Sequence, residues 1–215
     1  MHLFDYDGPL MRALIYIGEL ILLNLLSLLC CLPIVTIGAS VTAMYVVTFH
    51  NLDGKGSHAC RQFLTAFRAN FKQATLEWLV MLLAAVLLYV DFCIITQTDF
   101  AGKAAVEIVF VCVLTLFFPT LVFLFPIQAY FENTVPRTLK NAVALGLAKF
   151  PQSILLLLLN GFPLIFLYFN ITVFFRLLPF WAIIGFSGTA QIGTYLFRRI
   201  FRKLTTVRKP EEPTQ

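Results

Sequence analysis

Three polar side chains stand out inside the long apolar runs of this sequence: Glu19, Asn24 and Asp91. Burying a carboxylate or an amide in an apolar environment is costly, so such residues often mark a functional path. Glu19 is the strongest candidate because it is ionisable. It also lies about one and a half turns into its run, from where its side chain could reach the interface. Asp91 stands near the end of its run, where it could simply contact water.

Catalytic and metal-binding motifs are missing from the sequence. The apolar runs contain no Ser/His/Asp set, no paired carboxylates and no metal-ligand spacing. The three His residues lie outside these runs, and the five Cys residues have no paired spacing. His50, His58 and Cys60 share a loop, but without a second Cys or a helical His pair they are more typical of solvated surface than of a metal site. We therefore expect neither an enzyme nor a bound cofactor or metal.

One basic segment, 60–72, has the pattern of a helix that lies at a membrane interface. Aromatic residues recur in it every four residues, and basic residues occupy the other side. A second amphipathic segment, 137–149, precedes a later apolar run. We expect such helices to form a cytoplasmic contact surface, carried in the first segment by Arg61, Phe63, Phe67, Arg68, Phe71 and Lys72.

The composition places these residues in a membrane protein. Sixty per cent of the residues are hydrophobic and only 13% are charged, against roughly 45–50% and 25% in soluble domains. The apolar runs have the length of about 20 residues that a spanning helix needs. We predict an all-α, polytopic transmembrane bundle in a single domain, 1–215, with helices near 14–32, 34–49, 74–97, 104–130, 152–173 and 179–200, and interfacial helices near 60–72 and 137–149.

The first apolar run leaves the number of spans open. Leu14–Phe49 is too long for one crossing, and Pro33 and Gly38 interrupt it as a candidate helix break. If the chain turns back there, the protein has six helices in three hairpins and a cytoplasmic N-terminus. If the break only kinks one helix, five spans remain and the N-terminus is external. Arg12, which precedes the first leg, favours six.

Basic residues predict the orientation. Thirteen of the 16 Lys and Arg residues fall in the segments 50–77 and 131–151 and in the tail that begins at Arg198. By the positive-inside rule these segments and the C-terminus are cytoplasmic. The charge of +5 thus indicates contact with the lipid bilayer of the cell membrane, and not nucleic-acid binding.

Several motifs together suggest a family. The chain is similar to the YesL-like family of bacterial membrane proteins, a domain of unknown function (624). The resemblance covers essentially the whole chain, with its most specific motifs at Pro9–Arg12, Asn24–Leu26, Cys31–Ser40, Ala43–Tyr45 and Phe63–Ala74. It implies a role auxiliary to carbohydrate utilisation, because relatives tend to be encoded beside carbohydrate-uptake and polysaccharide-degradation genes.

Two functions remain open from the sequence. The first is a non-enzymatic accessory to carbohydrate uptake, with carbohydrate-transporter components as partners. The alternative is a small membrane carrier or channel that uses Glu19, Asn24 and the Pro33–Gly38 region as its path. The substrate, the protein partner and the oligomeric state cannot be predicted from the sequence.

Overall fold

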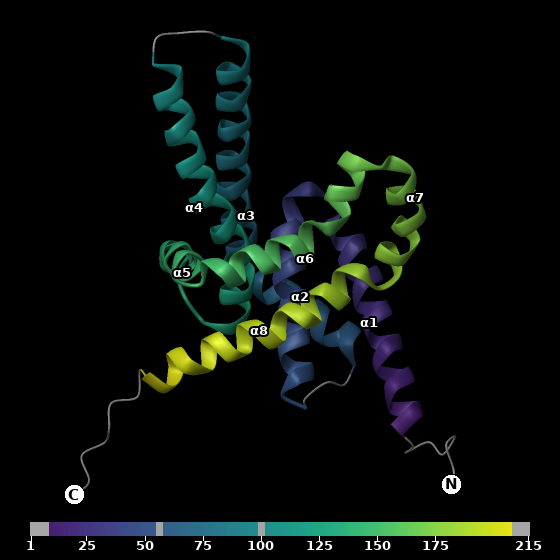
Figure 1. Ribbon diagram of the computed structural model, residues 1–215. Coiled ribbons are helices and arrows are strands. Elements are labelled where there is room, and N and C mark those ends of the chain that lie inside the picture. Colours follow the sequence, from purple (N-terminus) through teal and green to yellow (C-terminus); the bar gives the residue numbers. More distant parts are fainter. Residues whose placement is uncertain (1–8, 55–57, 99–101, 208–215) are drawn as a thin grey trace, which may run out of the picture.

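A computed structural model describes residues 9–54, 58–98 and 102–207 of the chain (Figure 1). Within these ranges every regular element is helical, as the composition predicted. The elements in chain order are α1 Pro9–Cys31, the 3₁₀ turn η1 Ile34–Thr36, α2 Ile37–Leu52, α3 Ala59–Gln97, α4 Lys103–Tyr130, α5 Val135–Ala148, α6 Phe150–Phe169, α7 Ile171–Phe180, the π-helical turn η2 Trp181–Gly185 and α8 Phe186–Val207.

The described part of the chain contains five segments long and apolar enough to cross a membrane. A sixth crossing results if α5 and the first part of α6, which meet at a bend of 102°, form one broken span. The predicted multi-pass helical protein with five or six spans is therefore confirmed. The five segments are Leu10–Cys31, Ile34–Leu52, Ala59–Gln97, Lys103–Tyr130 and Ile171–Leu204.

The break in the first apolar run is a turn and not a kink. The hydroxyls of Ser27 in α1 and Ser40 in α2 lie 2.9 Å apart, so the two helices return along each other. Pro33 immediately precedes η1, and Thr36 closes the turn by donating to the carbonyl oxygen of Cys30 at 2.6 Å. Two of the five candidate spans come from this hairpin.

The second hairpin, α3 and α4, is longer than the first (Figure 1). The predicted interfacial helix 60–72 and span 74–97 form one unbroken helix of 39 residues, about 58 Å long. The indole N–H of Trp78 donates to the carbonyl oxygen of Ile34 at 2.7 Å. The turn of the first hairpin therefore packs halfway along α3, and the second hairpin extends about 28 Å beyond it.

The last part of the chain differs most from the predicted bounds. The helix predicted at 152–173 is α6, which ends at Phe169, and the segment 174–178, predicted as a connection, is helical. Asn170 causes the break, because its side chain caps α7 by accepting from the backbone N–H of Val173 at 3.2 Å. The helix predicted at 179–200 thus lies inside a longer run. Pro179, which cannot donate a backbone hydrogen bond, is followed there by the π-helical turn.

Aromatic packing joins α2, α4 and α8 in the core. Phe197 of α8 meets Tyr45 of α2 and Phe123 of α4 in edge-to-face contacts, with ring centroids 5.8 and 5.2 Å apart. Phe123 and Phe197 are fully buried. Because lipid is as apolar as these rings, close packing rather than removal from water holds the helices together within a membrane.

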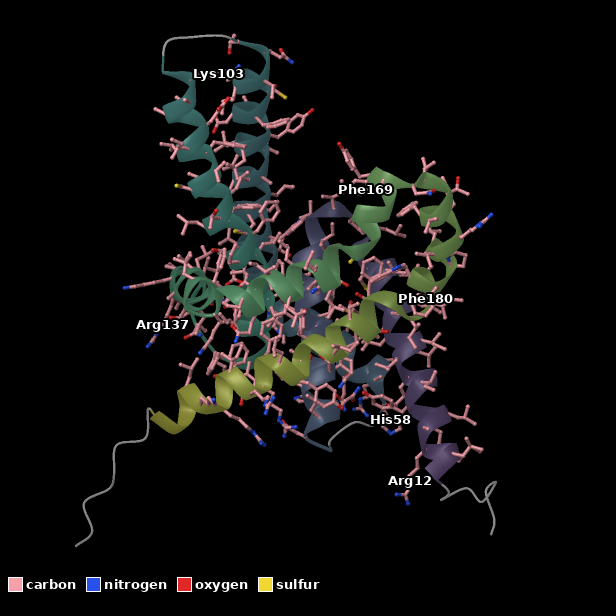
Figure 2. All side chains as sticks on the ribbon, viewed as in Figure 1. Arg12, His58, Lys103, Arg137, Phe169 and Phe180 are labelled. Carbon is pink, nitrogen blue, oxygen red and sulfur yellow. The ribbon has the colours of Figure 1, made fainter. Side chains whose placement is uncertain are left out.

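Charged groups mark two opposite ends of the molecule. Arg12 and His58 lie at one end, and Lys103 lies at the far tip of the second hairpin (Figure 2). Arg198 of α8 donates to the carbonyl oxygen of Leu52 at 2.7 Å and pairs with Asp53, next to the end of α2. The start of α8's basic segment therefore lies beside the loop that follows α2. The end of the molecule that carries Arg12, His58 and Arg198 is called the basic end below.

Candidate functional site

The basic side chains predicted as a contact surface are exposed on the first half of α3. Arg61, Arg68 and Lys72 all face outward. Their helix is amphipathic as predicted, but its aromatic stripe does not lie uniformly on the surface. Phe63 is fully buried, whereas Phe71 is 38% exposed.

The aromatic stripe of α3 enters the protein core at one end. Rings of Phe63 and Phe67 stack with centroids 6.1 Å apart, and Phe67 meets Phe71 at 5.5 Å. Phe63 belongs to the main hydrophobic core cluster. The prediction that Phe63 forms part of an outer contact surface is therefore wrong. Neighbouring helices cover its position, and the sequence of α3 alone could not reveal them.

Glu19 lies beside the start of α3. It is half-buried and lines a cavity of about 460 Å³, together with His58 and Arg61. The cavity is thus shared between α1 and the basic end. Glu19 is therefore close to the predicted contact surface.

Asn24 ties α1 to the last helical run. Its side-chain nitrogen donates to the carbonyl oxygens of Trp181 and Ala182 at 3.2 and 2.7 Å. Its side-chain oxygen accepts from the backbone N–H of Ser187 at 2.9 Å. The residue is fully buried. The side-chain amide of Asn24 therefore holds α1 against the π-helical turn and the start of α8.

Gly38 does not break a helix. It lies in the first turn of α2, after the break at Leu32 and Pro33. A Cβ at this position would meet the carbonyl oxygen of Ala74 at 2.4 Å and the Cβ of Trp78 at 2.6 Å. Gly38 is required because α2 and α3 approach so closely. The prediction of Gly38 as a breaking residue is corrected accordingly.

Asp91 stands apart from the other candidates. It is exposed on the C-terminal half of α3. It lines a cavity of about 210 Å³ between α3 and α4, where its neighbours are apolar. Glu19 lines a different cavity, and Asn24 is occupied by the last helical run. The structure therefore does not join Glu19, Asn24, Asp91 and the Pro33 turn into one site.

A buried polar cluster, not predicted from the sequence, lies where α3, α4 and α5 meet. Its centre is Glu77, which is 0% exposed. The side-chain nitrogen of Gln73 lies 3.0 Å from Glu77 Oε1, 2.7 Å from Gln128 Oε1 and 2.7 Å from the carbonyl oxygen of Asn133. The hydroxyl of Thr138 donates to Gln128 Oε1 at 3.3 Å. Glu77 Oε2 is buried and has no hydrogen-bond partner among the described residues.

A helical pattern in the sequence could have located this cluster. Buried residues of α3 recur at helical spacing, three, four or eight positions apart, from Phe63 through Ala66 and Ala74 to Glu77 and Met81. Glu77 continues this inward face. Sequence analysis placed it instead at the end of a basic loop, because charged residues usually lie in loops between apolar runs.

A polar cavity of about 680 Å³ adjoins the buried cluster. Amide side chains on α3, on α4 and in the loop that follows α4 line it, together with an acidic and a basic residue. Alanine, aromatic and threonine side chains line the rest. The cavity therefore offers several polar groups, from Asn70, Gln73, Gln128, Asn133, Glu132 and Arg137.

Residues able to hold a tightly bound metal are scattered. In the ranges that the structure describes, no three His, Cys, Asp or Glu side chains gather in one place. All five Cys residues are free thiols. Some of the described polar side chains instead form hydrogen bonds between helices, as with Thr48 and Thr194, whose hydroxyls lie 2.8 Å apart.

Comparison with known proteins gives one family match, which covers about a third of the chain, residues 20–92. Searches of curated proteins and of solved structures gave no match. The family match spans the first hairpin from Leu20 onward and most of α3, including the basic face and Glu77. The family model described as "Protein of unknown function, DUF624" matches residues 20–92, which agrees with the family expected from the motifs.

Proposed function

We propose that this protein is a non-enzymatic, multi-pass accessory protein of the cell membrane that acts beside a carbohydrate transporter. In this proposal the basic end and the C-terminus face the cytoplasm. The observation that carries it is the position of Arg61, Arg68 and Lys72, which are exposed on the first half of α3. Carbohydrate transport as the setting rests on the family resemblance.

Electrostatics favours an acidic cytoplasmic partner for this surface. Three exposed positive charges within 12 residues of one helix attract acidic side chains over roughly one Debye length, about 8 Å at physiological salt. Such charges mainly accelerate association and select the partner. The adjoining amide-lined cavity adds hydrogen-bonding groups to the same region.

A carrier function has weaker support. The three hydrogen bonds of Asn24 hold two helical runs together. Glu19 and Asp91 line separate cavities. A path that combined these residues would require the helices to rearrange. We therefore expect purified protein in liposomes to transport no sugar, and Glu19→Ala to leave this result unchanged. Sugar uptake that Glu19→Ala abolishes would favour the carrier instead.

Co-purification from gently solubilised membranes tests the accessory function. Wild-type protein should recover transporter components, and Arg68→Glu should reduce their recovery several-fold because it places a negative charge in the basic face. Arg176→Glu provides the matched control, since Arg176 is an exposed arginine on α7. Equal recovery with all three proteins, or no transporter component with the wild type, would contradict the proposal.

A further inference from the structure

The buried cluster around Glu77 contains more oxygen acceptors than hydrogens to satisfy them. One amide nitrogen, that of Gln73, carries two hydrogens but lies within bonding distance of three oxygens. The Thr138 hydroxyl carries one hydrogen and lies near Gln128 Oε1 and the carbonyl oxygen of Thr134, at 3.3 and 3.2 Å. The Thr134 carbonyl also accepts from the backbone N–H of Thr138 at 2.9 Å, so four hydrogens face five oxygens, and Glu77 Oε2 is the oxygen left without a partner.

A buried carboxylate without a partner is costly, and a bound cation removes that cost. Oxygen atoms of carboxylate, amide, hydroxyl and backbone carbonyl groups are the ligands that hard cations prefer. The Glu77 carboxylate, Gln128 Oε1 and the Asn133 carbonyl oxygen, three of these four types, all lie within 3.0 Å of the Gln73 amide nitrogen. The fourth type is the Thr138 hydroxyl, which lies 3.3 Å from Gln128 Oε1.

Charge balance restricts the cation to one positive charge. Glu77 brings one negative charge into the cluster, and the other groups named there are neutral. Glu132 and Arg137 line the adjoining cavity and carry opposite charges. A divalent ion would leave an uncompensated positive charge in a buried site. The cavity, which shares Gln73 and Gln128 with the cluster, provides the route of entry.

We propose that Glu77, Gln128 and Thr138 form a binding site for a small monovalent cation at the junction of α3, α4 and α5. The site is independent of the docking function, since Glu77 is buried and touches no exposed basic side chain through a described hydrogen bond. Occupancy would hold together three helices that otherwise meet around an unsatisfied carboxylate.

Thermal unfolding of the purified full-length protein in detergent tests the site. At constant pH and ionic strength, Na⁺ or K⁺ in place of choline should raise the unfolding temperature by several degrees. Mg²⁺ should raise it no more than choline does. Glu77→Gln should abolish the cation effect, and Glu19→Gln, which changes a carboxyl outside the cluster, should preserve it.

A second variant tests the oxygen ligands separately, and the wild type alone shows whether any cation stabilises the protein. Thr138→Val removes one oxygen ligand at nearly constant volume and should increase severalfold the Na⁺ concentration needed for half of the stabilisation. If Glu77→Gln does not fold, equal unfolding temperatures of the wild type in Na⁺, K⁺ and choline would still overturn the proposal. A temperature that depends on pH but not on cations would also overturn it, because Glu77 would then hold a proton. Stabilisation by Mg²⁺ alone would do the same.

Discussion

At the scale of single residues, several polar side chains in the apolar helices link one helix to another. Asn24 bonds three backbone positions of the last helical run, and Ser27 bonds Ser40 across the first hairpin. Hydrogen bonds between helices in a membrane contribute roughly 0.6–1 kcal/mol each. Asn24 is therefore expected to contribute to stability more than any single-bond link.

Replacing Asn24 tests this role. Asn24→Leu keeps a similar volume but removes three hydrogen bonds, and should lower the free energy of unfolding by about 2 kcal/mol. Denaturant titration of the purified protein measures the change. Asn160→Leu serves as the control, because Asn160 is exposed and bonds only the preceding turn of its own helix, at Leu156. Equal effects of the two substitutions would show that Asn24 does not link the helices.

At the scale of helices, close contact between α2 and α3 fixes the position of the first hairpin. The contact depends on the missing side chain of Gly38, since Ala74 and Trp78 would lie within 3 Å of a Cβ there. The backbone of α3 cannot move away locally, because Ala74 lies in the middle of a continuous helix.

Two separate glycine-to-alanine variants test this helix contact. Gly38→Ala should destabilise the protein by about 1–3 kcal/mol, because the two helices must separate. Gly18→Ala, in α1, meets no described atom within 4 Å and should stabilise by up to about 1 kcal/mol through helix propensity. Thermal unfolding of both variants gives the comparison. A neutral Gly38→Ala would disprove the close contact.

The helices themselves could be predicted from the sequence far better than the contacts between them. An apolar run longer than about 18 residues identifies a span whatever its neighbours in the fold are. For example, α4 begins and ends within one residue of its predicted bounds. Partners of Asn24 and Gln73 come from residues distant in sequence, such as Ser187 and Gln128. No local pattern contains that information. Asn170 escaped prediction for a related reason, since a cap inside an apolar run resembles an ordinary interruption.

At the scale of the whole molecule, the two hairpins reach different distances from the basic end. The turn of the first hairpin meets Trp78, whereas the second hairpin continues for about 28 Å to its tip near Thr98. A membrane from which the tip of the second hairpin emerges on the far side would therefore still cover the turn of the first hairpin.

Cysteine labelling measures this difference in depth. In a background without native Cys residues, Thr98→Cys should react with a membrane-impermeant thiol reagent added outside the cell. Val35→Cys, in the turn of the first hairpin, should react much more slowly, although its side chain is 48% exposed in the protein. Similar rates at both positions would place the two hairpin ends in one plane.

We propose that the exposed basic face of α3 binds a cytoplasmic protein. Site-specific photo-crosslinking in living cells tests this binding most directly. The photoreactive residue replaces either Lys72, on this face, or Tyr89, on the C-terminal half of the same helix. The side chain of Tyr89 is 68% exposed. The account predicts a discrete protein adduct from position 72, weakened several-fold by Arg68→Glu, and no such adduct from position 89. An adduct from position 89 alone, or none from position 72, would contradict it.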